Sequence, residues 1–431
     1  MAHDIGVWLF AEPVGTLSLE GGRLSFQYRH DQLAQPDAVA LSQSLPLGPD
    51  AFDDHQCRAF FAGLLPEGNL RRLIAQQCQV SSQNDFALLN AIGGECAGAI
   101  TFVPHGQPVA TADQPGIEWL DEPQLMALLD ELPRRPMLAG RDGVRLSLAG
   151  AQDKLPVVFD GQRIGLPTGG QPSTHILKPA IAAVENSVLN EGFCLMLAQA
   201  LGLPTAQVQI FGVQDRQVLL VTRYDRRVGG DGHPVRIHQE DFCQALGVVP
   251  EMKHQNEGGP DLKACFDLLR KATRPSAPQV LRLLDAVVFN ALIGNHDAHA
   301  KNFSLLYSGQ SKNAAPTLAP LYDMLCTVVY DHLSPKMAMK LGSKYKFAKV
   351  HARHWEQFAQ DAGLSKAQTK KRVLKIAQQL PTVARGLRAK QPFAGRSLIN
   401  KMVKLIDQRA ALTIRRLTEG GPVTQADDKE A

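Results

Sequence analysis

The sequence predicts an α+β fold of two unlike lobes, and three observations support this. Strand signals separated by turn residues fill the first half of the chain, and helical periodicity dominates from about residue 238 onward. At 431 residues, the chain is also too long for one ordinary core. We expect a β-rich part at 1–145, a further strand-rich part at 146–237, an all-α part at 238–418 and a disordered tail at 419–431.

The first strands are predicted at 5–10, 15–19 and 24–28, because Glu12-Pro13 and Glu20-Gly21-Gly22 are turn signals between them. A helix is predicted at 57–78, broken or kinked at Pro66. Residues 104–118 contain three prolines and two glycines, which favours an exposed connection.

Short strands and one helix are predicted in the middle of the chain. The strands fall at 144–148, 155–159, 164–166 and 175–178, a helix at 185–201, and a hairpin at 207–211 and 217–222 around Asp215. Beyond residue 238, helices are predicted at 280–293, 354–362, 366–380 and 398–417. The first of these has the most regular apolar spacing, at i, i+3, i+4 and i+7.

Charge is distributed unevenly along the chain. Residues 331–420 hold 20 Lys and Arg against 5 Asp and Glu, a net charge of +15, although the whole chain carries only +4. A basic span of this kind suggests a polyanionic partner. The alternative is a solvated basic face that neutralises an acidic neighbouring domain.

Cysteine usage and hydropathy indicate a cytoplasmic protein that does not enter a membrane. The seven cysteines include no C-x-x-C pair, which argues against a disulfide framework and a structural zinc site. No run reaches ~18 apolar residues, and the first residues have neither a basic nor an apolar signal region.

The segment from Ile293 to Phe303 carries most of the chemical information. Asp297 precedes Asn302 by five residues, the spacing of the protein-kinase loop H-R-D-x-x-x-x-N, where the Asp accepts the substrate hydroxyl proton and the Asn binds magnesium. Asp323 follows where the second magnesium ligand of a kinase would stand. His299 falls where many kinases carry a lysine that contacts the transferred phosphate. The sequence therefore predicts phosphoryl transfer with ATP and Mg²⁺.

Simpler explanations stay open for each of these residues. Asp297 could cap a short helix starting at Ala298, Asn302 could be a turn residue, and Asp323 another helix cap. His299 could form only a local hydrogen bond.

Three other segments could contact a nucleotide. Lys178 ends an apolar strand, as does the lysine that holds the α- and β-phosphates in kinases. Ser147 to Lys154 contains small residues that would let backbone N–H groups approach phosphate oxygens. Thr222 to Arg227 could flank an adenine ring. A solvated lysine, a plain β-turn and a charged turn are the respective alternatives.

A metal-dependent phosphohydrolase is a competing prediction. His296-Asp297 matches the His-Asp dyad of such enzymes, with His299 as a further nitrogen ligand. His254 and His332 are the nearest other histidines, and neither stands in a ligand-like context.

In this order along the chain, several motifs resemble those of the HipA family of serine/threonine kinases, the toxin half of HipA–HipB modules. The resemblance spans nearly the whole chain, from Ser44-Leu45-Pro46-Leu47 and Leu64-Leu65-Pro66-Glu67 onward. The other matching segments are Ser147 to Lys154, His175 to Lys178, Arg223 to Arg226, Asp297 to Ser304 and Tyr322-Asp323. The resemblance implies a bilobal protein-kinase-like fold, with a nucleotide-binding part at 146–237 and a catalytic part at 238–418.

The resemblance also implies roles for particular residues. Asp297 would be the catalytic base, Asn302 and Asp323 the magnesium ligands, and Lys178 a phosphate ligand. Leu148, Ala149, Gly150, Ala151 and Gln152 would form the phosphate-covering loop, Thr222 and Tyr224 would flank adenine, and Ser147 would be the autophosphorylated serine. The family often has Glu-Arg-Phe where this chain has Thr222-Arg223-Tyr224.

The partners that the resemblance implies are a substrate, an antitoxin and DNA. The substrate would be glutamyl-tRNA synthetase, whose phosphorylation halts translation and yields dormant, drug-tolerant cells. The antitoxin would be a dimeric helix-turn-helix HipB protein that binds operator DNA and represses its own operon. The basic side chains that we expect nearest to DNA lie on the helix at 366–380: Lys366, Lys370, Lys371, Arg372 and Lys375. A catalytically silent co-repressor is the further alternative, against which the complete set of site residues argues.

Overall fold

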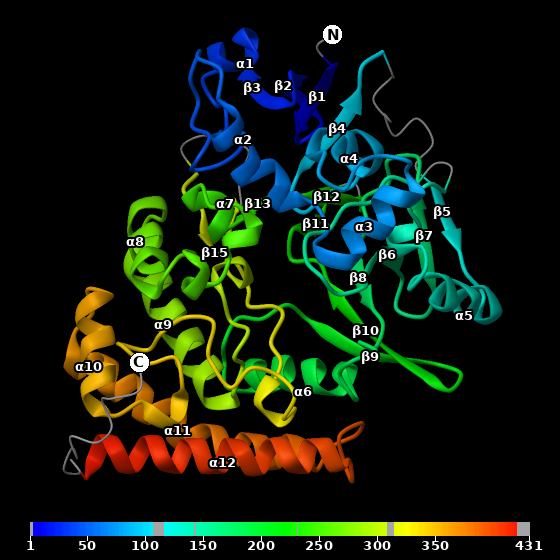
Figure 1. Ribbon diagram of the computed structural model, residues 1–431. Coiled ribbons are helices and arrows are strands. Elements are labelled where there is room, and N and C mark those ends of the chain that lie inside the picture. The colour runs from blue at the N-terminus through cyan, green and yellow to red at the C-terminus, as the bar shows by residue number, and fades with distance from the viewer. Residues whose placement is uncertain (1–2, 107–115, 142–143, 231, 308–313, 420–431) are drawn as a thin grey trace. The chain divides into compact units, whose positions relative to one another are not determined.

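The structure is a computed structural model that describes residues 3–106, 116–141, 144–230, 232–307 and 314–419 (Figure 1). The predicted tail therefore lies outside the described residues from 420 onward. The chain divides into two compact units. Unit 1 comprises Met1–Ala183, Ala206–Glu251 and Ser304–Ala319, and unit 2 comprises Val184–Thr205, Met252–Phe303 and Pro320–Ala431.

Unit 1 begins with a four-stranded antiparallel sheet in the order β3-β2-β1-β4. Its strands are β1 (His3–Leu9), β2 (Glu12–Glu20), β3 (Arg23–Tyr28) and β4 (Ile100–Pro104). The three strands predicted before residue 30 are thus confirmed. Burial alternates along β1 and β3, so each presents one face to the core.

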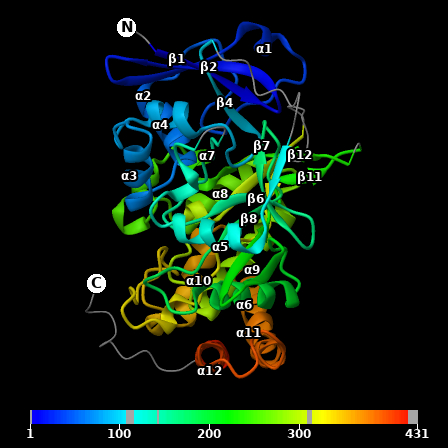
Figure 2. The same cartoon turned by 90° about the vertical axis from the view of Figure 1, so that its right-hand side faces the viewer.

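A second antiparallel sheet in unit 1 has six strands in the order β5-β7-β6-β8-β10-β9. These are β5 (Gly116–Trp119), β6 (Leu155–Phe159), β7 (Ile164–Thr168), β8 (His175–Lys178), β9 (Val208–Val213) and β10 (Arg216–Thr222). Figure 2 shows β7, β6 and β8 side by side. The predicted strands in this region are confirmed except for 144–148, where the structure has an isolated bridge between Leu146 and Glu95 and no strand.

The helices of unit 1 are short. They are α1 (His30–Ala34), α2 (Asp54–Phe61), α3 (Gly68–Gln77), α4 (Asp85–Ile92), α5 (Glu122–Glu131) and α7 (Phe242–Leu246). The single helix predicted at 57–78 is two helices, because α2 ends before Pro66 and α3 begins after it. Buried apolar side chains from both sheets and from α2 to α5 form one continuous core, which includes Phe26, Phe61, Phe102 and Leu177.

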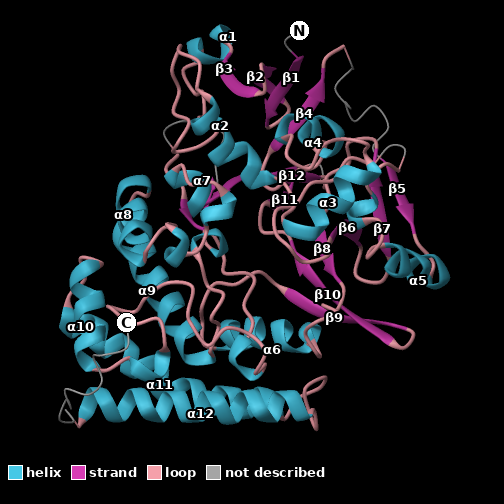
Figure 3. Ribbon diagram, in the orientation of Figure 1, coloured by secondary structure: helices cyan, strands magenta, loops and turns pink. Residues whose placement is uncertain are grey.

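Unit 2 is helical (Figure 3). Its helices are α6 (Ser187–Ala200), α8 (Leu262–Ala272), α9 (Ser276–Ile293), α10 (Ala352–Asp361), α11 (Lys366–Arg388) and α12 (Ser397–Thr418). The longest pair, α11 and α12, packs together, and both also contact α6 and α9. The side chains of Asp261 and Ser365 cap the N-termini of α8 and α11, and α11 continues through Pro381.

Within the described residues, α9 alone is long and apolar enough to cross a membrane, with a mean hydropathy of 1.3. However, 61% of its residues are buried inside the protein, which is typical of a core helix. Its residues from Val280 to Ile293 follow the predicted apolar pattern.

The α+β class is confirmed. However, strands and helices are not separated along the sequence as completely as predicted. The all-α part expected at 238–418 also contains β13 (His238–Asp241), β14 (Ser304–Tyr307) and β15 (Thr317–Leu318), which form one small sheet of unit 1. A further hairpin, β11 (Arg226–Val228) with β12 (Pro234–Arg236), precedes it. The predicted domain boundaries at 145, 237 and 418 stay predictions.

Candidate active site

The end of α9 positions the Asp297 loop, which we define as residues 294–303. Gly294 terminates the helix in the left-handed conformation at φ 77°, and its N–H donates to the Asn290 carbonyl. A Cβ atom at this position would collide with Val328. Glycine is therefore required both by the backbone angle and by the close packing.

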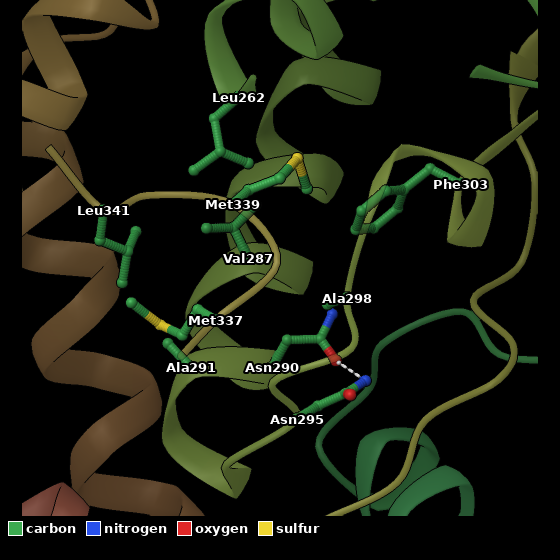
Figure 4. Close-up of a pocket in the computed structure, with 10 residues that line it drawn as sticks. All are labelled: Leu262, Val287, Asn290, Ala291, Asn295, Ala298, Phe303, Met337, Met339 and Leu341. Atoms are coloured by element: carbon green, nitrogen blue, oxygen red, sulfur yellow. Dashed lines mark hydrogen bonds between the residues drawn. The ribbon is translucent and has the colours of Figure 1, made fainter. Parts of the chain in front are cut away.

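Two buried asparagines hold the start of the loop. The Asn295 side chain donates to Oδ1 of Asn290 over 2.9 Å, and its own Oδ1 accepts the Asp297 N–H over 3.1 Å. Both asparagines also line a small pocket of about 30 Å³ against α9, where the other lining side chains are mainly apolar (Figure 4). The backbone of Asp297 is thus anchored to the core helix through Asn295.

The side chain of Asp297 is 64% exposed. The short 3₁₀ turn that follows begins at Ala300, with His299 at its N-cap position, and so it does not start at Ala298 next to Asp297. A helix-cap role for Asp297 at that position is therefore not supported. An exposed carboxylate on an anchored backbone is the arrangement that a general base requires.

Asn302 is part of the same loop, and Asp323 follows a residue that contacts the loop. The Asn302 side-chain amide donates to the Asp297 carbonyl over 2.9 Å, and Tyr322 donates through its hydroxyl to the Lys301 carbonyl over 2.8 Å. Asp323 follows directly and has φ 52°, a backbone angle that non-glycine residues rarely adopt. Strained residues of this kind cluster at functional sites.

His299, in the same loop, is buried, and its Nε2 lies 3.9 Å from Oδ1 of Asp297. Burial, followed by Lys253, His254 and Lys301, lowers the pKa of His299 well below its usual value, and Asp323 partly opposes this. The imidazole is therefore neutral at pH 7. It does not supply the positive charge that a lysine would bring to this position.

His296 does not join Asp297 as the hydrolase prediction required. Its backbone N–H donates to Thr327, and its Nδ1 lies 3.2 Å from the Ser334 carbonyl. Burial, with a smaller effect of Arg409, lowers the pKa of His296 to about 4. In the described part of the chain, the histidine and carboxylate side chains that gather here are His254, Asp297 and His299.

In unit 1, the segment from Ser147 to Gln152 is attached to the Leu64-Leu65-Pro66-Glu67 motif. Ser147 is fully buried and its hydroxyl donates to the Leu64 carbonyl over 2.8 Å. The Glu67 N–H donates to the Gly150 carbonyl over 3.0 Å. Gly150 has φ 112°, and a Cβ there would lie 2.8 Å from the Lys154 ammonium. The two motifs, distant in sequence, thus form one loop structure.

Lys178 and Thr222 lie on neighbouring strands of the six-stranded sheet. Lys178 is buried and pairs with Leu219, whereas Thr222 pairs with His175. Tyr224 donates through its hydroxyl to Gln239 over 2.5 Å. The predicted site residues therefore divide into a set in unit 1 and the Asp297 loop with Asp323 in unit 2.

A buried ionic cluster beside Thr222 was not predicted. Glu95 accepts hydrogen bonds from Arg226 over 2.8 Å and from Arg236 over 2.6 Å, and Arg223 pairs with Asp225 over 2.7 Å. Burial alone would raise the pKa of Glu95, but the surrounding guanidinium groups outweigh it and hold that pKa well below its usual value. Since its charges are paired and buried, we interpret this cluster as a scaffold.

Comparisons with known proteins decide the family. The sequence-family model of the HipA-like C-terminal domain matches residues 146–384. The family model of the HipA N-terminal domain matches residues 5–103. The chain belongs to the HipA family. Y4mE of Sinorhizobium fredii is 46% identical over 86% of this chain and 89% of its own length.

A HipA protein of Shewanella oneidensis is also similar to this chain, in sequence and in structure. The serine/threonine-protein kinase toxin HipA of Shewanella oneidensis is 29% identical over 85% of each chain. A solved complex of HipA, HipB and operator DNA from the same organism matches with a TM-score of 0.83 and 25% identity, covering 97% of this chain and all of that one. This HipA-family chain is therefore a serine/threonine kinase of the toxin–antitoxin class.

A HipA-family kinase uses ATP and, typically, a divalent metal. Asn302 and Asp323 fit such a metal, because both offer oxygen donors beside the Asp297 loop.

The predicted DNA-contacting side chains on α11 are not equivalent. Lys366, Lys370, Lys371 and Lys375 are exposed. Arg372 instead forms two hydrogen bonds with Asp285, one of them at 2.7 Å. Arg372 is thus engaged within unit 2, and we restrict the expected phosphate contacts to the four lysines.

Proposed function

We propose that this kinase transfers the γ-phosphoryl group of ATP to a protein serine and acts as the toxin of a HipA–HipB type module in the cytoplasm. The observation that carries the proposal is the Asp297 loop, an exposed acid held by Asn295 and Asn302 at the end of a core helix. When bound, ATP would supply the transferable group and Mg²⁺, held by Asn302 and Asp323, would neutralise its charge.

The protein residues then have distinct tasks. Asp297 accepts the proton of the attacking serine hydroxyl, for which its exposed carboxylate is accessible. Lys178 and the backbone of Leu148 to Gln152 hold the phosphates, while Thr222 and Tyr224 flank adenine. His299, neutral and buried, orients the loop and does not act as a cation.

The proposed substrate is an aminoacyl-tRNA synthetase, with glutamyl-tRNA synthetase as the first candidate from the family resemblance. Phosphorylation of this enzyme would stop translation and produce dormant cells. A panel of synthetases incubated with the kinase and γ-labelled ATP, followed by phosphosite mapping, tests this. We expect one labelled synthetase, and labelling of none of them would contradict the proposed substrate class.

Ser147 is the proposed autophosphorylation site. Because its side chain is fully buried and bonded to the Leu64 carbonyl, a phosphate cannot be accommodated in the described conformation. Phosphorylation would therefore release Ser147 to Gln152 from Leu64 and Glu67 and end phosphate binding. Label on Ser147 in the wild type, and its loss in Ser147→Ala, is the expected result. Undiminished label in Ser147→Ala would rule the site out.

The proposed antitoxin is a HipB-type helix-turn-helix dimer on operator DNA, and the similar Shewanella complex contains HipA, HipB and operator DNA. Charged contacts from Lys366, Lys370, Lys371 and Lys375 would make the affinity of the complex for DNA fall with salt. Lys371→Ala with Lys375→Ala should reduce the slope of log affinity against log salt by about 2. Lys401→Ala with Lys404→Ala, on exposed positions of α12, is the matched control.

The metal-ligand assignment has its own test. Asp323→Ala should weaken magnesium-dependent ATP binding and abolish transfer, because a magnesium ligand is lost. Calorimetry that shows unchanged affinity for ATP with magnesium would contradict this assignment. DNA-complex binding without any phosphoryl transfer would instead favour a silent co-repressor.

A further inference from the structure

Three side chains that could bind a metal gather at the Asp297 loop, and they differ from the proposed magnesium ligands. His254, Asp297 and His299 each offer one ligand atom, and these atoms all lie within 4.8 Å of one another. His254 comes from a segment distant in sequence, just before α8, and its ring meets that of His299 edge to face at 5.2 Å. Two imidazoles and a carboxylate are therefore brought together by the fold of unit 2.

The donor set selects the kind of ion. Magnesium prefers oxygen ligands, whereas imidazole nitrogen suits zinc and similar transition metals. A tetrahedral zinc site with ligand bonds of about 2.0–2.1 Å places neighbouring donor atoms roughly 3.3–3.5 Å apart. The observed 3.9 Å between Nε2 of His299 and Oδ1 of Asp297 is only slightly longer.

The surroundings are compatible with such an ion but do not make the site a strong one. An imidazole binds a metal ion through the lone pair of a ring nitrogen, and both histidines offer one at this cluster. Lys253 and Lys301 lie near enough to oppose a cation, whereas Asp323 would attract it. Nδ1 of His299 has no hydrogen-bond partner among the described residues, and a missing partner of this kind typically weakens metal binding by about 10- to 100-fold.

We propose that His254, Asp297 and His299 bind a divalent transition-metal ion such as Zn²⁺, and that this ion inhibits the kinase by occupying the Asp297 carboxylate. A carboxylate that is bound to the ion cannot accept the proton of a serine hydroxyl. The inhibition rests on the proposed role of Asp297 as the base, whereas the metal site itself does not. The kinase would then be active with magnesium and silenced when free zinc rises.

Metal binding can be measured without reference to activity. Full-length protein without a histidine tag is titrated with Co²⁺, whose visible absorption reports nitrogen and oxygen coordination, and then with Zn²⁺ to displace it. We expect the wild type to bind one ion that His254→Gln binds at least about tenfold more weakly. His332→Gln, which changes an exposed histidine of the same unit, is the matched control and should behave as the wild type.

Inhibition is measured by label transfer from γ-labelled ATP at saturating magnesium with increasing zinc. His254→Gln should transfer label at the wild-type rate without zinc, and should require at least about tenfold more zinc for half-inhibition. His332→Gln should be inhibited as the wild type is. The cysteines are the same in all three proteins, so zinc bound by them does not affect the comparison.

The outcomes separate the two proposals. Equal metal binding by the wild type and His254→Gln would overturn the site whether or not the kinase is active. A metal site that is lost in His254→Gln, in a protein that transfers no label under any condition, would support the site and contradict the proposed base. Zinc-dependent release of phosphate from ATP without labelled protein would overturn the inhibitory role and favour a hydrolase.

Discussion

Unit 1 and unit 2 each bring together acidic and basic side chains from distant parts of the chain. The two units differ in how far the acidic side chain is buried and paired. Glu95 in unit 1 is almost fully buried and is surrounded by the guanidinium groups of Arg223, Arg226 and Arg236. The backbone of Asp297 in unit 2 is held by Asn295 and Asn302, and 64% of its side chain is exposed. A buried, paired acid stabilises a fold, whereas an exposed acid on a fixed backbone can exchange a proton.

This contrast predicts that replacement of Glu95 has the largest effect on stability. Glu95→Gln would leave the buried guanidinium groups of Arg223 and Arg226, and the partly buried one of Arg236, with too little negative charge. Breaking a buried ion pair costs about 3–5 kcal/mol. We expect a loss of unfolding free energy of this size in denaturant titrations. Glu118→Gln, at an exposed pair with Arg141, should change stability by less than about 1 kcal/mol. Equal effects of the two substitutions would contradict the scaffold interpretation.

Asn295 tests how the Asp297 loop is anchored. Asn295→Ala removes the acceptor for the Asp297 N–H and the donor to Asn290, which is itself buried. Leaving a buried polar group without a partner costs about 1–3 kcal/mol. We expect a loss of stability in this range together with a loss of phosphoryl transfer.

The control is Asn400→Ala, an exposed position on α12 in the same unit. It should change stability by no more than about 0.5 kcal/mol and leave transfer intact. Full activity in Asn295→Ala would show that the loop does not depend on this anchor.

Glu240 sharpens the comparison, because it is another buried acid of unit 1 and the hydrogen-bond donors that face it within the described residues are neutral. Its carboxylate accepts hydrogen bonds from Ser42, from Tyr307 and from the Gln43 N–H. Burial raises the pKa of Glu240 to about 7. The folded state therefore binds more protons than the unfolded state between about pH 4.5 and 7, and this group makes stability fall as pH rises through that window.

Glu240→Gln keeps a hydrogen-bonding side chain but cannot ionise. The stability of the variant relative to the wild type should thus increase by ~1–3 kcal/mol from pH 5 to pH 8, measured by thermal or chemical unfolding. Glu95 should act in the opposite direction, since its lowered pKa makes folding less stable as pH falls. A difference between Glu240→Gln and the wild type that does not change with pH would contradict the account of this residue.

Much of the fold could be predicted where local pattern and packing agree. The apolar periodicity of α9 and the hairpin of β9 and β10 are examples, since both are stabilised by contacts close in sequence. The strands β13 and β14 could not be predicted, because they have four residues each and pair across more than fifty residues of chain. The strand expected at 144–148 failed because only Leu146 finds a bridge partner, Glu95.

Prediction of the site is limited in the same way, because sequence patterns identify only residues that are close along the chain. The spacing of Asp297 and Asn302 is local, so the sequence alone indicates that they are neighbours, and their catalytic roles stay predictions. His254 could not be found in this way, because only the tertiary fold brings it to His299. His296, in contrast, is adjacent to Asp297 in sequence, yet its ring lies against the Ser334 carbonyl. Adjacency in sequence does not determine where a side chain points.

The central claim is that Asp297 acts as a base and has little structural role. The direct test is the single-turnover transfer of label from γ-labelled ATP to protein by Asp297→Asn, measured beside its unfolding free energy and its affinity for ATP with magnesium. We expect the transfer rate to fall by about 10²- to 10⁴-fold while stability and ATP affinity stay at wild-type values. Transfer at the wild-type rate in Asp297→Asn would contradict the account.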